Sequence, residues 1–297
     1  MEVIRAKRAG ACYGVQRALD MADEVIAEGS RAFTLGPLIH NPQVVSDLAE
    51  RGAEPVESVE AIVWNGAGEV GTDVTADASA TAPSVVIRSH GVTPEVLAAV
   101  TDRGFTVVDA TCPHVARAQA AAAELAEQGC RVIVVGEEGH PEVEGLTAWA
   151  RQAGGKVDVV ASPADIPEGL YDPVGVVAQT TQRRENLEAV VAALTEAGLN
   201  PIVKNTICSA TRQRQEAAAD LAAHVDAMVV IGGRNSSNTT RLAEVCSLTC
   251  PRTFHIESAD ELDPAAFEGC ARIGVTAGAS TPENQIAAVE AFLKTLS

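Results

Sequence analysis

The stretch Thr106-Val-Val-Asp-Ala-Thr-Cys112-Pro-His-Val-Ala-Arg-Ala-Gln-Ala-Ala-Ala122 decides the fold of this 297-residue chain. Its first half is a short β-branched run, typical of a buried strand. Its second half opens on Pro113, which is well tolerated in the first turn of a helix, and continues with alanines that favour a helix. The stretch therefore predicts a strand that leads directly into a helix, with Cys112 at the junction.

The same pattern of strand, cysteine and helix occurs twice more, and such internal repeats indicate how a chain is organised. Val3-Ile-Arg-Ala leads to Cys12, and Pro201-Ile-Val-Lys-Asn-Thr-Ile leads to Cys208. In each copy a second strand then ends in a glycine-containing loop. The residue 28 positions after the cysteine lies in that loop, and the three equivalent residues are His40, His140 and Ser236.

A third strand in each copy ends in another polar loop and leads into another helix. The three loops are Ser89-His-Gly-Val-Thr, Gln179-Thr-Thr-Gln and Ala277-Gly-Ala-Ser-Thr. We therefore expect an α/β fold, a three-lobed trefoil of three βαβαβα domains with mostly parallel sheets around a central site. The predicted domains are residues 1–104, 105–200 and 201–297, with an insertion loop at 65–82 that is rich in Gly, Ala, Thr, Asp and Ser.

The carboxyl ends of parallel strands are where open α/β sheets bind ligands. Cys12, Cys112 and Cys208 follow equivalent strands, so three lobes facing one axis would bring the three thiols together. Three thiolates with one open position suit zinc, and they also suit a 4Fe-4S cluster with one iron free of protein ligands. Because no close Cys-x-x-Cys pair is present, the spacing favours the iron–sulfur cluster.

The other strand ends carry groups that bind anions. His40, His90 and His140 lie at predicted strand ends, and Asn235-Ser-Ser-Asn and Gly278-Ala-Ser280 add hydroxyls, amides and helix N-termini. A diphosphate fits such a pocket. Glu142, at the start of a helix beside it, is a candidate proton donor, with Thr180 or Thr181 as a relay.

Composition limits the partners. The net charge of −18 disfavours nucleic acid, and no run of about 18 apolar residues predicts a membrane helix. The N-terminus lacks the apolar core of a signal peptide, so we expect a cytoplasmic protein. We also expect a monomer, although nothing in the sequence determines the oligomeric state. Cys246 and Cys250 are four residues apart at a helix end and could be two ligands on one face. We nevertheless interpret all four cysteines off the repeat as ordinary core or surface residues: Cys130, Cys246, Cys250 and Cys270.

Several motifs in order resemble the 4-hydroxy-3-methylbut-2-enyl diphosphate reductase family from the N-terminus to the last helix. They are Cys12-x-Gly-Val, Ser89-His-Gly-Val, Asp109-Ala-Thr-Cys-Pro, Gly139-His-Pro-Glu-Val-Glu-Gly, Gln179-Thr-Thr, Asn235-Ser-Ser-Asn and Thr276-Ala-Gly-Ala-Ser. The resemblance implies the last step of the non-mevalonate isoprenoid pathway. It also implies a 4Fe-4S cluster and a ferredoxin or flavodoxin as electron donor.

By position, the resemblance assigns the three repeat cysteines Cys12, Cys112 and Cys208 as cluster ligands. It assigns Glu142 as the proton-relay acid and Thr180 as the threonine near the substrate hydroxyl. The residues that it assigns to the diphosphate are His40, His90, His140, Ser236, Ser237, Asn238 and Ser280.

Three alternatives stay open at this stage. A non-redox iron–sulfur hydro-lyase would turn over without a reductant. A cluster-based sensor would have no diphosphate pocket, and a zinc hydrolase would be colourless.

Overall fold

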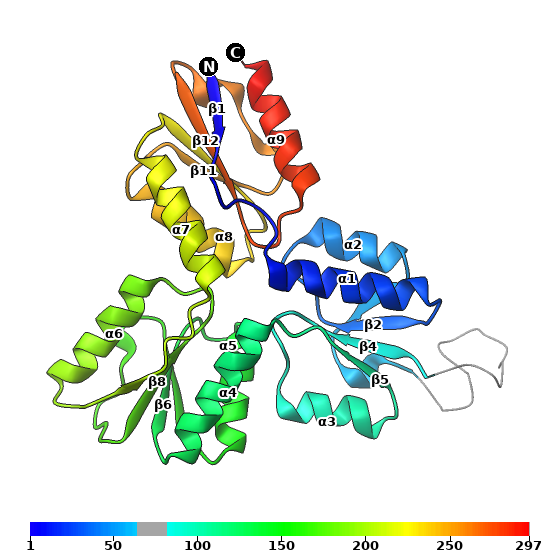
Figure 1. Ribbon diagram of the computed structural model, residues 1–297, viewed down its shortest axis with the longest axis vertical. Coiled ribbons are helices and arrows are strands. Elements are labelled where there is room, and N and C mark those ends of the chain that lie inside the picture. Colours follow the sequence, from blue (N-terminus) through cyan, green and yellow to red (C-terminus); the bar gives the residue numbers. More distant parts are fainter. Residues whose placement is uncertain (64–81, 297) are drawn as a thin grey trace. The chain divides into compact units, whose positions relative to one another are not determined.

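The computed structural model describes residues 1–63 and 82–296, and these residues form three four-stranded sheets with flanking helices (Figure 1). The predicted α/β fold of three lobes, each with its own parallel sheet, is confirmed. The predicted insertion at 65–82 lies, except for Ala82, outside the described residues. Packing divides the chain into two compact units: Met1–Tyr13, Thr180–Glu185 and Ile207–Ser297 form the first, and Gly14–Gln179 and Asn186–Thr206 form the second.

The first unit contains the sheet with strand order β1-β12-β10-β11, in which every pairing is parallel. Side chains alternate along β10, so Val229 and Ile231 join one core with Ile286, while Val230 joins the other with Leu242. The elements are β1 (Glu2–Arg5), α7 (Ser209–Ala222), β10 (Ala227–Ile231), α8 (Ser237–Ser247), β11 (Thr253–Ile256), η3 (Ala259–Glu261), η4 (Pro264–Phe267), β12 (Arg272–Ala277) and α9 (Glu283–Thr295).

The second unit contains two parallel sheets, with orders β3-β2-β4-β5 and β7-β6-β8-β9. The elements around the first are α1 (Tyr13–Ala27), β2 (Ala32–Leu35), α2 (Pro42–Glu50), β3 (Ala53–Val56), η1 (Val59–Ala61), β4 (Ser84–Ile87), α3 (Pro94–Asp102) and β5 (Thr106–Asp109). Those around the second are α4 (Pro113–Glu127), β6 (Arg131–Val135), α5 (Pro141–Gln152), β7 (Val157–Val160), η2 (Pro163–Asp165), β8 (Val174–Ala178), α6 (Arg184–Glu196) and β9 (Ile202–Val203).

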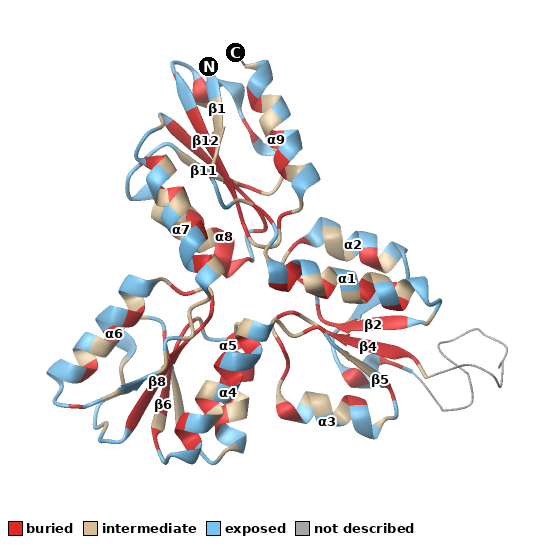
Figure 2. Cartoon of the chain, viewed as in Figure 1, coloured by how far each residue is buried: buried red, intermediate tan, exposed pale blue. Residues whose placement is uncertain are grey.

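Buried central strands explain why these short apolar runs form sheets. The strands β2, β4, β8 and β10 are buried along their whole length and β6 is buried after its first residue, whereas the helices bury one face only (Figure 2). Strands covered on both faces need continuous apolar sequence rather than alternation. Within the described residues, no helix combines the length and apolar character needed to cross a bilayer.

The leading strand of each repeat pairs outside the predicted domain. β5 pairs with β4, β9 pairs with β8, and β1 pairs with β12 at the other end of the chain. The predicted ranges 1–104, 105–200 and 201–297 therefore each differ from the observed sheets by one strand. In a repeating pattern of strands and helices, the domain boundary can be drawn before or after any strand. The hydrophobic pattern alone does not say which neighbour a strand pairs with.

A fourth strand in each sheet was not predicted. These edge strands are β3, β7 and β11, and each pairs on one side only, with β2, β6 and β10 respectively. Pro55 within β3 lacks a backbone N–H, which an edge position tolerates. The β-branched runs at Val157–Val160 and Thr253–Ile256 were the available signal.

Candidate functional site

Each of the three repeat cysteines lies next to the loop that follows a central strand. The backbone N–H of Cys112 donates to the carbonyl of Ser89 at 3.0 Å, in the loop after β4. In the first unit, the N–H of Cys12 donates to Ala279 at 3.1 Å and that of Cys208 to Thr180 at 2.9 Å. The predicted equivalence of the three cysteines is therefore present in the hydrogen bonding of the backbone.

Exposure separates these three cysteines from the other four. Cys12, Cys112 and Cys208 are partly exposed, and none of the seven cysteines forms a disulfide. Each precedes a helix directly, where N–H groups favour negative charge. The remaining cysteines are buried, so of the two expected positions, core or surface, they occupy the core, and burial raises the pKa of the Cys246 thiol to about 12. The four buried cysteines are Cys130, Cys246, Cys250 and Cys270.

Helix α1 begins against the loop that holds Cys112. A Cβ atom on Gly14 would lie less than 3.0 Å from Cys112 Sγ, so only glycine fits there. Arg17 donates to the carbonyl oxygens of Thr111 at 3.2 Å and Asp109 at 3.3 Å.

Three histidines of the second unit form a close cluster, which we call the three-histidine cluster (His40, His90 and His140). The ring centroids of His40 and His90 are 4.3 Å apart, and those of His140 are 5.4 and 5.6 Å from them. Both ring nitrogens of His40 and Nδ1 of His90 are shielded from solvent and have no hydrogen-bond partner among the described residues. Buried polar atoms of this kind indicate a missing ligand.

The cluster is uncharged at neutral pH. Burial, followed by the neighbouring His40 charge, lowers the pKa of His140 to about 4, although Glu137 opposes the shift. Burial also lowers the pKa of His90 well below its usual value and, with Arg88, lowers that of His40. Each neutral ring keeps one N–H donor and one lone pair.

Arg88 is the functional candidate that sequence reasoning missed. It directly follows β4 and is partly buried, and its charge contributes to the lowered pKa of all three histidines. Its Nε donates to the Gly91 carbonyl at 3.3 Å. Nitrogen atoms of the three rings lie within 4.8 Å of one another, a spacing near that of a metal site, but a guanidinium beside them repels a cation. The charge therefore favours an anion.

Packing between the two sheets of the second unit positions the cluster. Helix α3 of the first sheet packs against α5 of the second, and Trp149 Nε1 on α5 donates to the carbonyl of Val92, two residues after His90. His140 caps α5 by accepting from the Glu142 N–H at Nδ1, at 3.1 Å. Glu142 itself is only 1% exposed. The strand ends that carry His90 and His140 are thus held beside each other.

The remaining predicted binding residues lie in the first unit. Ser236 caps α8, and its Oγ accepts from the Thr239 N–H at 3.4 Å. Asn238 is 4% exposed, and neither its Oδ1 nor its Nδ2 has a partner among the described residues. Ser237 is also buried, and Ser280 is partly buried in the loop after β12. The orphaned amide of Asn238 indicates a polar ligand near the start of this helix.

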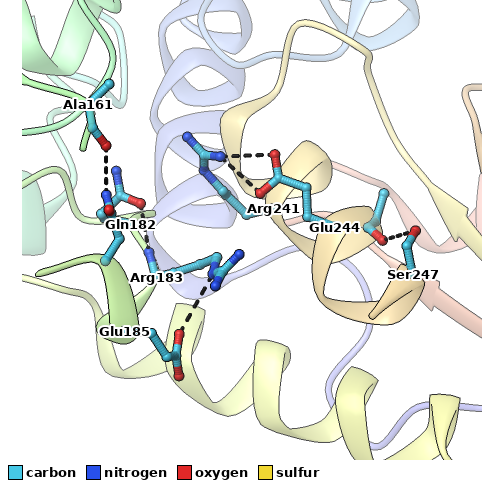
Figure 3. A network of polar contacts seen from close by, with 9 residues as sticks. Ala161, Gln182, Arg183, Glu185, Arg241, Glu244 and Ser247 are labelled. Carbon is cyan, nitrogen blue, oxygen red and sulfur yellow. Dashed lines mark hydrogen bonds and ion pairs between the residues drawn. The ribbon is translucent and has the colours of Figure 1, made fainter. Parts of the chain in front are cut away.

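Charges near α8 are already compensated. Arg241 pairs with Glu244 at 2.9 Å, and Arg183 pairs with Glu185 at 3.7 Å (Figure 3). Any anion at the start of α8 would therefore meet hydroxyls, amides and the helix N-terminus rather than these arginines.

The fold and the site together define a class of α/β proteins. In this class, three equivalent cysteines lie at helix starts, and a cluster of neutral histidines is suited to an anion. The family model described as LytB protein matches residues 3–294, so the chain belongs to this family. A relative from Pelobacter propionicus, named 4-hydroxy-3-methylbut-2-enyl diphosphate reductase, is 46% identical over 284 residues, covering 95% of this chain and 94% of that protein. One of the same name from Geobacter metallireducens is 48% identical over 286 residues, covering 95% and 93%.

Two solved structures of reductases are also similar to this chain. The structure of an (E)-4-hydroxy-3-methyl-but-2-enyl diphosphate reductase, described as the terminal enzyme of the non-mevalonate pathway, matches with a TM-score of 0.69 and 40% identity, covering 99% of this chain and all of the other. The E-1-hydroxy-2-methyl-but-2-enyl-4-diphosphate reductase from Plasmodium falciparum matches with a TM-score of 0.85 and 22% identity, covering 99% and 87%, which supports the fold.

Proposed function

We propose that this chain is a 4-hydroxy-3-methylbut-2-enyl diphosphate reductase. It consumes two electrons and two protons, breaks the allylic C–O bond, releases water, and forms isopentenyl and dimethylallyl diphosphates. One observation carries the proposal: the same backbone hydrogen bond occurs three times, from the N–H of a repeat cysteine to a carbonyl in the loop after a central strand. The three cysteines are Cys12, Cys112 and Cys208. The names of the relatives favour this function over a hydro-lyase or a sensor.

The three repeat cysteines fit an iron–sulfur cluster by their chemistry. They are the partly exposed thiols of the chain, each at a helix start, and the lack of a side chain at Gly14 leaves room for the Sγ of Cys112. We propose that Cys12, Cys112 and Cys208 hold a 4Fe-4S cluster. When bound, such a cluster supplies electrons and one iron without a protein ligand.

The diphosphate is assigned to the three-histidine cluster and to Ser236, Ser237, Asn238 and Ser280. At His140, Nδ1 accepts from a backbone N–H, so the neutral ring keeps its proton at Nε2 and can donate there. Arg88 adds positive charge close to the rings. Because anions raise histidine pKa values, diphosphate binding should be accompanied by proton uptake.

Glu142 is proposed to supply protons, with Thr180 next to the substrate hydroxyl. Both are buried, which limits access of water to a reduced allylic species. The test is anaerobic turnover with a reduced dye, comparing the wild type with Glu142→Gln. Glu144→Gln is the matched control, because Glu144 lies in the same helical turn and is exposed.

We expect Glu142→Gln to lower kcat at least about 100-fold, the usual range for loss of a general acid. Glu144→Gln should keep the wild-type rate. Full activity in Glu142→Gln would remove Glu142 from the mechanism. A wild-type protein that is colourless after anaerobic reconstitution with iron and sulfide, and that does not consume the diphosphate, would refute the function itself.

A ferredoxin or flavodoxin is the proposed electron donor, and the cytoplasm the proposed location. Such donors are usually acidic, and Lys7 and Arg8 are exposed between β1 and Cys12. Arg5 is used differently, because it pairs with Glu283 at 2.8 Å and Glu290 at 2.6 Å. Reversing the charge at Lys7 and Arg8 should slow turnover with the protein donor and leave dye-driven turnover unchanged. If the charge-reversed variant and the wild type turn over at equal rates with the protein donor, the docking site for the donor lies elsewhere.

A further inference from the structure

Arg214 is a buried cation on α7 that the reaction described above does not use. It is 5% exposed, and among the described residues no carboxylate pairs with it. Its Nη2 donates to the Gly10 carbonyl at 2.9 Å, its Nη1 to the Ala210 carbonyl at 3.5 Å, and its Nε has no partner. Burying a guanidinium is unfavourable unless an opposite charge compensates for it.

The charge of Arg214 interacts with two of the repeat thiols, which lie in the same compact unit. Burial lowers the pKa of Arg214, and attraction to Cys12 and Cys208 opposes that shift. The neighbouring Arg212 differs in both respects, since it is exposed and pairs with Glu216 at 2.8 Å. The charge of Arg214 therefore interacts with the thiols of Cys12 and Cys208 rather than with a carboxylate.

The hydrogen bonds of Arg214 also join two segments that are far apart in sequence. Gly10 lies 204 residues before Arg214 and two residues before Cys12. Helix α7 begins directly after Cys208 and carries Arg214 inside its second turn. One guanidinium thus connects the segment that leads to Cys12 with the helix that starts at Cys208.

We propose that Arg214 is a positioning residue that holds the Gly10–Cys12 segment against α7 and supplies the buried positive charge for the thiolates of Cys12 and Cys208. Its part in balancing the negative charge of an iron–sulfur cluster rests on the proposed function. Its field at the two thiols exists with or without the cluster, and the two statements can be tested separately.

The first test uses the reduced, cluster-free protein under anaerobic conditions. Each thiol is alkylated with iodoacetate, which is anionic, and with iodoacetamide, which is neutral, and labelled peptides are quantified by mass spectrometry. The iodoacetate rate divided by the iodoacetamide rate reports the local electrostatic field, because the same thiolate reacts in both cases and only the charge of the reagent differs. Arg212→Gln is the control for removing a positive charge from the same helix.

We expect Arg214→Met to lower the ratio about three- to tenfold at Cys12 and Cys208, as removal of a unit charge in a partly shielded site should do. Arg212→Gln should change the ratio at Cys12 and Cys208 less than twofold. Arg214→Lys should restore most of the ratio, because it keeps the charge. An unchanged ratio in folded Arg214→Met, judged by circular dichroism, would overturn the proposal.

The wild type alone provides a second test if Arg214→Met does not fold. Its ratio at Cys12 and Cys208 should exceed that of the same peptides in the urea-unfolded chain by the same three- to tenfold. Equal ratios in the folded and unfolded chains would also overturn the proposal.

The reduction potential of the loaded protein tests the link to the cluster. Arg214→Met should make reduction harder by up to tenfold in the one-electron equilibrium, which is about 59 mV, while Arg214→Lys should stay close to wild type. A potential unchanged in Arg214→Met would refute the charge-balancing role. Failure of the wild type to take up a cluster would instead refute the proposed function, whatever the alkylation ratios show.

Discussion

Acid should destabilise this fold through the three-histidine cluster, and His140 allows the effect to be calculated. The pKa of its ring is about 4 in the folded protein, against 6.5 for an ordinary histidine. Between these values the unfolded chain binds more protons than the folded one. The stability is therefore fully present above pH 6.5 and is lost as the pH falls towards 4.

For His140 alone, this difference amounts to about 2 kcal/mol of unfolding free energy lost between pH 7 and pH 5. The shifts of His40 and His90 have the same direction and add to it. His140→Asn is the matched variant, because asparagine is also a good N-cap and can accept from the Glu142 N–H as the imidazole does. It removes the titrating group and keeps the cap.

Urea denaturation of the cluster-free protein at a series of pH values measures the effect. The pH dependence of the wild type should exceed that of His140→Asn by about 2 kcal/mol over this range. Curves for the two proteins that run parallel from pH 7 to pH 5 would refute the claim that burial keeps this ring neutral. Inorganic diphosphate should reduce the difference, because a bound anion favours the charged ring.

Three further predictions concern buried contacts. Gly14→Ala should displace Cys112 and reduce iron incorporation, which is measured by iron content and visible absorption; full incorporation would argue against the close approach. Asn238→Leu should raise the unfolding free energy of the ligand-free protein by about 1–2 kcal/mol and weaken diphosphate binding by calorimetry, and unchanged affinity would remove Asn238 from the pocket. Gly274→Ala, whose Cβ would meet Met228 Sδ inside 3.0 Å, should destabilise the protein by about 1–3 kcal/mol in a thermal melt, unless the flexible sulfur moves away.

The sequence by itself determined the class of the fold and the identity of the repeat. Short apolar strands followed by alanine-rich helices can only be buried as covered parallel sheets. A cysteine in the same register three times also singled out Cys12, Cys112 and Cys208, which are partly exposed, whereas the other four cysteines are buried. These features are local or periodic, so they are visible in one dimension.

Tertiary structure alone decided which strands pair and which charges are buried. Each leading strand joins the sheet of the preceding repeat, with β1 closing onto β12, because pairing depends on the path of the chain in space. Arg88 and Arg214 look like ordinary surface charges in the sequence. Only packing removes water from them, and a charge has its full effect on neighbouring histidines or thiols only where solvent no longer screens it.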